Sequence, residues 1–109
     1  MVNFDKYRKL LANGLFLSHH AQEELREENI TIDDIKKTIL EGSATFDRST
    51  QNDKSHAWNN ERHISAHLEK ENLTIVFCKS KENGILIISC YHGKSHNYYS
   101  NPYNRKFNY

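Results

Sequence analysis

The segment RHISAHL, residues 62–68, is the clearest indication of the fold, because from His63 onward its polar and apolar side chains alternate with a period of two. Successive side chains of a β-strand point to opposite faces of a sheet, so the pattern predicts a strand. The apolar set, expected to face a core, is Ile64, Ala66 and Leu68. The polar set, expected on a face open to solvent or ligand, is His63, Ser65 and His67.

Two further segments continue this sheet. LTIVFC (residues 73–78) and ILIISCY (residues 85–91) are rich in β-branched residues, and the turn-forming segment KSKENG (residues 79–84) joins them. A weak strand near residues 44–48 precedes a polar loop that reaches residue 61. We therefore expect an antiparallel sheet of three or four strands.

Helical signals precede the sheet. Apolar residues from Phe4 to Leu11 recur at helical spacing until Asn13-Gly14, and LFL (residues 15–17) follows as a brief strand. Ser18 is placed to cap one helix, and TIDD (residues 31–34) opens another that ends at Gly42. The order predicts an α+β fold, with two or three N-terminal helices packed on one face of the sheet.

The length of 109 residues suits a single domain over residues 1–109, with a core at about residues 4–92 and a C-terminal arm at 93–109. The longest apolar runs, such as residues 85–88, are far shorter than the roughly 20 residues that cross a bilayer, so no membrane partner is expected. The first residues lack a secretory signal, and we expect a cytoplasmic protein.

Charge is segregated although the net charge is only +1. Residues 1–83 hold 12 basic and 14 acidic side chains, whereas residues 84–109 hold 3 basic and none acidic. Seven of the acids lie between Glu23 and Glu41, which puts a negative field on one element and leaves the opposite side available to an anion.

Cysteine and glycine content argue against several classes of site. Cys78 and Cys90 lack the spacing of a zinc knuckle and are expected as small buried residues. The four glycines are isolated, so the chain has no glycine-rich phosphate loop. His19 with Glu23, and His20 with Glu24, have metal-ligand spacing, but two ligands on one helix do not complete a site. We expect no metal and no cofactor.

The histidines carry the candidate chemistry. His20 stands in the first turn of the capped helix, where the helix dipole favours a neutral ring that acts as a base. His63 and His67 share one strand face, and YHGK (residues 91–94) ends the last strand with a phenol, an imidazole and an ammonium group.

These groups are the parts that metal-independent RNA cleavage needs: a base for the 2′-OH proton, an acid for the 5′-oxygen and cations for the phosphate. The candidate catalytic residues are His20 or His63 as base, His92 as acid, Arg62 on phosphate and Tyr91 as an orienting or stacking group. The C-terminal arm interleaves aromatic and cationic side chains, which suits unpaired RNA but also suits an arm packed on the body. The candidate RNA-binding residues are His67, Lys94, Tyr98, Tyr99, Arg105 and Lys106.

Residues 18–35 (SHHAQEELREENITIDDI), LEG at 40–42 and the two closing strands together resemble the bacterial domain-of-unknown-function family 4258 over about residues 15–92. His20 matches the His-Ala position of that family, and Arg26 matches its helical arginine. Such domains are similar in layout to RelE-like and barnase-like RNase toxins. The resemblance implies a toxin that acts on RNA, including ribosome-bound mRNA, and a cognate antitoxin or immunity protein that neutralises it.

A second function class remains open on the same residues. The chain would then be a non-catalytic protein-binding module, such as an immunity or regulatory protein, that uses the open sheet face and the aromatic arm as an interface.

Overall fold

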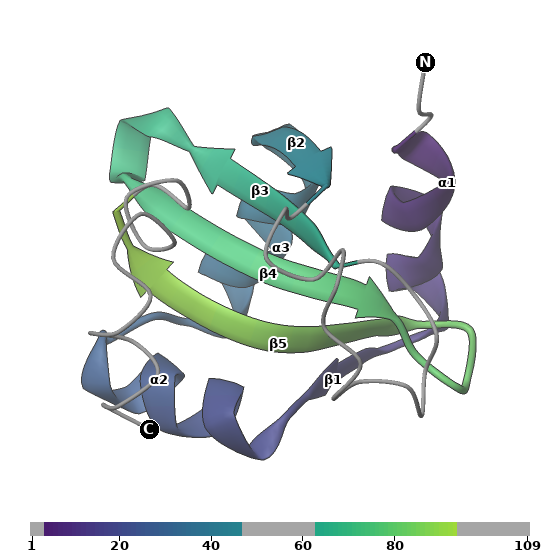
Figure 1. Cartoon of the computed structure of the whole chain (residues 1–109), viewed down its shortest axis with the longest axis horizontal. Helices are drawn as coiled ribbons and strands as arrows, with labels where there is room; N and C mark the ends of the chain where they lie inside the picture. The colour runs from purple at the N-terminus through teal and green to yellow at the C-terminus, as the bar shows by residue number, and fades with distance from the viewer. Residues whose placement is uncertain (1–3, 47–62, 94–109) are drawn as a thin grey trace.

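The computed structural model describes residues 4–46 and 63–93, and in these residues three helices and a five-stranded sheet form an α+β fold (Figure 1). The predicted fold class is therefore confirmed. The predictions that concern residues 47–62 and 94–109 lie outside the described residues. No helix in the described ranges is long and apolar enough to cross a membrane.

The first helix is short. α1 (Asp5–Arg8) continues as a 3-10 turn over Lys9–Asn13 and stops at Gly14, whose φ of 134° lies in a region that glycine tolerates best. The Arg8 side chain reaches the end of another helix, where Nε donates to Ile39 O (2.8 Å) and Nη2 donates to Gly42 O (3.0 Å). These bonds satisfy carbonyl groups that a helix C-terminus leaves without partners.

The other two helices begin at the predicted caps. In α2 (His19–Glu27), Ser18 Oγ accepts the N–H of Ala21 at 3.0 Å. In α3 (Ile32–Glu41), Thr31 and Asp34 form a reciprocal capping box. The backbone N–H and side chain of Thr31 lower the pKa of Asp34, with smaller contributions from the charges of Lys37 and His92.

The sheet has the order β1-β5-β4-β3-β2. Its strands are β1 (Leu15–Leu17), β2 (Ser43–Phe46), β3 (Ile64–Leu68), β4 (Leu73–Lys79) and β5 (Ile85–His92). The strands from β2 to β5 pair antiparallel, whereas β1 pairs parallel with β5. The sheet differs from the predicted three or four antiparallel strands by β1, which adds a fifth strand and pairs parallel. The difference arises because a three-residue strand carries no sign of its partner in its own sequence.

Gly84 permits the parallel pair. Ile85 N donates to Gly14 O at 2.9 Å, and a Cβ atom at position 84 would lie 2.5 Å from the same backbone oxygen. The absent side chain is therefore what lets β1 begin directly beside β5.

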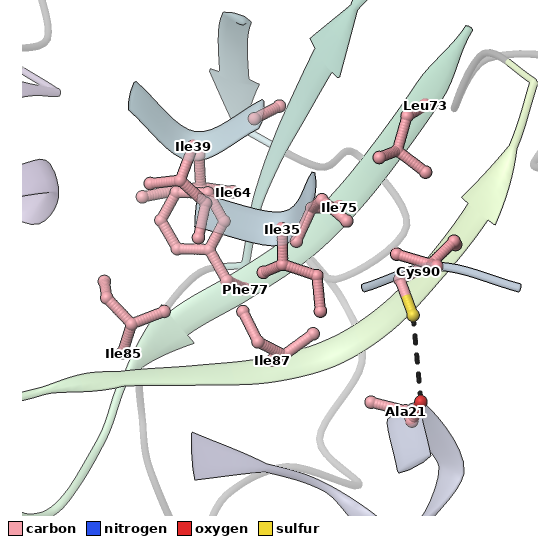
Figure 2. Packing of buried hydrophobic residues seen from close by; sticks show 12 residues of the cluster. Ala21, Ile35, Ile39, Ile64, Leu73, Ile75, Phe77, Ile85, Ile87 and Cys90 are labelled. Carbon is pink, nitrogen blue, oxygen red and sulfur yellow. Dashed lines mark hydrogen bonds between the residues drawn. The ribbon is translucent and has the colours of Figure 1, made fainter. Parts of the chain in front are cut away.

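α3 covers one face of the sheet, and the core lies between them (Figure 1). Figure 2 shows Ile35 and Ile39 of α3 packed over Ile64, Ile75 and Phe77 of β3 and β4. The predicted core side chains of residues 64, 66 and 68 are buried, and Cys78 and Cys90 are buried free thiols.

The opposite face of β3 differs from the prediction. His63 and Ser65 are only 2% and 3% exposed, so at these residues the face is not open to solvent. On β4, Val76 opposite Ser65 and Thr74 opposite His67 are also buried. Alternation correctly separates two faces here, but polarity does not reveal exposure, because a buried serine, threonine or histidine can satisfy its polar atoms by hydrogen bonding.

Truncation of the α3 core contact should test this packing. Ile35 is fully buried, so Ile35→Ala should lower the free energy of unfolding by about 2–5 kcal/mol through lost burial and a cavity. Ile32→Ala is the matched control on the same helix, because Ile32 is 39% exposed and should cost much less. Urea denaturation measures both, and equal losses would contradict the assigned core.

Candidate active site at the seam of α2 and β5

α2 lies along the edge of β5 beyond the point where β1 ends (Figure 1). β1 pairs with residues 85–87 of β5, and Ser18 connects the end of β1 to the start of α2. Its backbone N–H donates to Ile87 O at 3.0 Å, and its Oγ donates to Ile88 O at 3.1 Å. The residue that caps α2 therefore also fixes where the helix meets the strand.

Two glutamates of α2 accept hydrogen bonds from β5. Glu24 Oε1 accepts the N–H of Cys90 at 3.1 Å and the hydroxyl of Ser89 at 2.6 Å. Glu28 Oε1 accepts the N–H of His92 at 2.7 Å. Four residues of helix rise about 6 Å and two residues of strand about 6.7 Å, so the two spacings match. The carboxylates take the place of carbonyl groups from a neighbouring strand.

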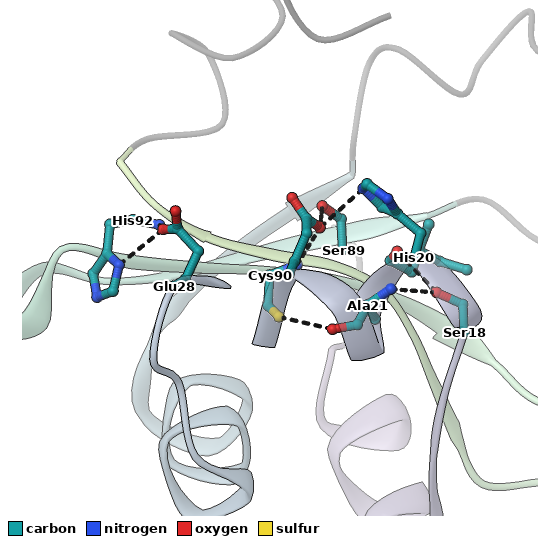
Figure 3. Close-up of polar contacts among 9 residues, drawn as sticks. Ser18, His20, Ala21, Glu28, Ser89, Cys90 and His92 are labelled. Carbon is teal, nitrogen blue, oxygen red and sulfur yellow. Dashed lines mark hydrogen bonds and ion pairs between the residues drawn. The ribbon is translucent and has the colours of Figure 1, made fainter. Parts of the chain in front are cut away.

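Each of these glutamates also contacts an imidazole (Figure 3). His20 Nε2 lies 3.0 Å from Glu24 Oε1, and His92 Nδ1 lies 2.9 Å from Glu28 Oε1. The His20 side chain is 34% exposed and that of His92 is 49% exposed, whereas Glu24 is buried. We call the contact of α2 with residues 87–92 of β5 the seam. It therefore holds two solvent-accessible imidazoles, each in contact with a carboxylate that is hydrogen-bonded to β5.

A third pair on the same helix lacks this anchoring. His19 Nε2 lies 3.3 Å from Glu23 Oε1 with the same spacing of four residues, but both side chains are largely exposed. The contacts of α2 with β5 distinguish the His20–Glu24 pair from this one, and sequence spacing alone does not.

His67 belongs to a different arrangement on β3 and β4. Its Nδ1 lies 2.8 Å from Thr74 Oγ1, and its Nε2 lies 3.4 Å from Glu69 Oε2. The order of hydroxyl, imidazole and carboxylate suits an activated nucleophile. However, Thr74 is fully buried and its hydroxyl donates to Gly93 O, so this hydrogen is directed to the end of β5. The cluster therefore holds the backbone of Gly93 through the hydroxyl of Thr74.

The remaining predicted residues are dispersed. His63 lies directly before β3, which β4 separates from β5, and therefore does not join His20 and His92. Tyr91 is buried on β5, where it stands opposite Thr74. The other predicted site residues lie outside the described residues: Arg62, Lys94, Tyr98, Tyr99, Arg105 and Lys106. Of the candidate bases and acids, the structure thus brings His20 and His92 to one seam.

A family model for a domain of unknown function (DUF4258) matches residues 17–92. The chain belongs to this family. The DUF4258 match begins in β1 and ends at His92, so the family domain contains the whole seam. No match was found among curated proteins or among solved structures.

Glu24, Glu28 and Ser89 were not predicted from the sequence as functional residues. The spacing of His20 and Glu24 was a usable signal, although it suggested an incomplete metal site. Glu28 and His92 are 64 residues apart and meet only because α2 lies against β5. In the described part of the chain, no group of three or more His, Cys, Asp and Glu side chains could hold a metal ion.

Cys90 lies in the seam but is not a candidate nucleophile. Burial, followed by the charges of Glu24 and Glu28, raises the pKa of its thiol to about 12. The thiol therefore stays protonated near neutral pH, and Sγ donates to Ala21 O at 3.7 Å. Cys90 packs α2 against β5.

Glu24→Ala should destabilise the fold. It would leave the Cys90 N–H and the Ser89 hydroxyl without their acceptor, at a cost of about 1–3 kcal/mol for each buried group. Glu23→Ala is the matched control, with an expected change of about 0.5 kcal/mol or less at an exposed site. Urea denaturation compares the two variants, and similar stabilities would show that the seam bonds contribute nothing measurable.

Proposed function

We propose that the chain is a metal-independent endoribonuclease that cleaves RNA by attack of the 2′-OH on the neighbouring phosphate. The observation that carries this proposal is the presence of two imidazole–carboxylate pairs, His20–Glu24 and His92–Glu28, on one seam. Imidazole exchanges protons close to neutral pH, and this reaction needs one group that accepts a proton and one that donates.

In the proposed reaction His20 removes the proton of the 2′-OH. The 2′-oxygen attacks phosphorus, and protonated His92 donates a proton to the departing 5′-oxygen. The products are a 2′,3′-cyclic phosphate and a free 5′-OH. The anchoring carboxylates stand one helical turn apart, about 6 Å along the axis, and His20 and His92 lie at the two ends of this row (Figure 3).

The partners follow from the family resemblance rather than from the geometry. We propose that the chain is a toxin of the RelE-like or barnase-like kind, acting in the cytoplasm on RNA, including ribosome-bound mRNA. A cognate antitoxin or immunity protein would neutralise it. Arg62, Lys94 and the cationic arm are the proposed phosphate and RNA contacts, on sequence grounds.

A non-catalytic protein-binding module is the second candidate. Its support is the exposure of three large apolar side chains, Phe16 on β1 and Ile32 and Leu40 on α3. Aromatic side chains such as that of Phe16 are enriched in the cores of protein interfaces, and this role requires no imidazole chemistry. Such a protein would form a stoichiometric complex and leave RNA intact.

Cleavage of a fluorescent DNA strand that contains one ribonucleotide tests the enzyme proposal. The wild type should cut it in EDTA, leave an all-DNA strand intact and produce the cyclic phosphate. His20→Ala and His92→Ala should each lower the rate by about 10²- to 10⁴-fold, the usual contribution of a general base or acid. His19→Ala is the matched control and should retain activity, because the His19 side chain is 89% exposed and its ion-pair partner Glu23 is also exposed. Cleavage of both strands, or equal activity of all three variants, would overturn the proposal.

A further inference from the structure

We infer that His67 of β3 is a positioning residue, which directs the hydroxyl hydrogen of Thr74 to Gly93 O and thereby holds the end of β5 that carries His92. The inference rests on the proposed function for the part that His92 plays in cleavage, whereas the hold on Gly93 is a property of the folded chain. His67 then acts within the protein rather than as the RNA contact that its strand position suggested.

The argument begins where the pairing of β4 with β5 ends. Gly93 N donates to Asn72 O at 2.8 Å, and the antiparallel pattern would complete this pair with a return bond from Asn72 N to Gly93 O. Asn72 has a left-handed backbone instead (φ 50°), and its N–H donates to Glu69 O at 3.1 Å. The hydroxyl of Thr74 donates to Gly93 O in its place.

The Thr74 hydroxyl lies between two groups, Gly93 O and His67 Nδ1, and it has one hydrogen to donate. A carbonyl oxygen only accepts, so this hydrogen is directed to Gly93 O. Thr74 Oγ1 must then accept from the ring, and His67 Nδ1, 2.8 Å away, carries the hydrogen. A ring with its hydrogen on Nε2 would make Nδ1 a second acceptor that competes for the hydroxyl. The imidazole therefore decides where the hydroxyl points.

The other ring nitrogen has no part in this arrangement. In the part of the chain that the structure describes, His67 Nε2 is buried and makes no hydrogen bond. It lies 3.4 Å from Glu69 Oε2, a contact that is an ion pair only when the ring is protonated. Nδ1 carries a hydrogen in the protonated ring as well. The bond to Thr74 therefore depends on a donor at the position of Nδ1 and not on the charge of the ring.

The consequence for His92 follows from the backbone of Gly93. Its φ of 113° lies in a region that glycine tolerates best, and a Cβ there would meet nothing within 4 Å, so packing leaves this residue room to move. The bonds to Asn72 O and from Thr74 hold the peptide groups on both sides of it. The N–H of the preceding residue, His92, donates to Glu28 Oε1 at 2.7 Å. The backbone that carries the His92 ring is therefore held from α2 and from β4.

Nitrogen-15 NMR of the His67 ring in the full-length wild type tests the direction of the bond. Near pH 8.5, where histidine is mostly neutral, the hydrogen should be on Nδ1. In Thr74→Val, which keeps the shape of the side chain but removes the hydroxyl, Nδ1 loses its acceptor and the ring should become a mixture of tautomers. A wild-type ring with its hydrogen on Nε2 would overturn the inference without any variant being made.

Paired substitutions test the role in cleavage. Thr74→Val and His67→Leu remove the two donors, whereas Thr74→Ser keeps the hydroxyl and His67→Asn keeps an amide N–H at the position of Nδ1. The first pair should exchange the Gly93 amide several-fold faster than the wild type and lower kcat by about tenfold or more, with KM unchanged. Thr74→Ser and His67→Asn should restore both the slow exchange and the rate.

The outcomes separate the two proposals. If the wild type cuts no RNA, but Thr74→Val and His67→Leu speed exchange at Gly93, the hold on Gly93 stands and the ribonuclease proposal fails. If the wild type cuts RNA and these two variants match its kcat, the positioning role is overturned and the ribonuclease proposal survives. A raised KM with unchanged kcat in both His67 variants would make His67 an RNA contact and would also overturn the positioning role. Where His67→Leu does not fold, the wild-type spectrum and Thr74→Val decide.

Discussion

The capping of the β5 edge by two carboxylates of α2 is the interaction on which the seam depends. β1 covers this edge only as far as Ile87, and an edge amide left without an acceptor in a buried setting is costly. Glu24 and Glu28 accept the N–H groups of Cys90 and His92 instead. The rise of one helical turn approximates the rise of two strand residues, so one helix can serve successive amides.

The hydrogen bonds that hold Glu24 and Glu28 against β5 also determine where the neighbouring histidines lie. A carboxylate buried at an edge amide must remain hydrogen-bonded, and the imidazole that approaches it meets a charge with a fixed position. His20 and His92 acquire their placement in this way, whereas His19 beside Glu23 has the same local spacing and no such support. The acidic residues Glu24 and Glu28 of α2 are unfavourable for the RNA binding that we propose, but they serve as acceptors for the amides of β5.

Local signals in the sequence were sufficient for much of the fold. The caps at Ser18 and Thr31, the end of α3 at Gly42 and the core side of β3 follow from short-range chemistry and were confirmed. The parallel pairing of β1 with β5 was not predicted, because three residues carry too little pattern to choose a partner. Buried His63 and Ser65 were wrongly expected at an open face, because burial depends on tertiary neighbours. At the seam, His20 and His92 were predicted as candidates from residue type and position, whereas Glu28 meets His92 across 64 residues and has no local signature in the sequence.

Amide hydrogen exchange at Cys90 and His92 is the most direct test of whether Glu24 and Glu28 accept hydrogen bonds from the edge of β5. If Glu24 and Glu28 serve as acceptors for the strand edge, both amides should exchange as slowly as those of Ile75 and Phe77 within β4, and protection should fall when the carboxylates are protonated at acidic pH. Exchange at the rate of an uncovered strand edge at neutral pH, with the rest of β5 protected, would contradict the account.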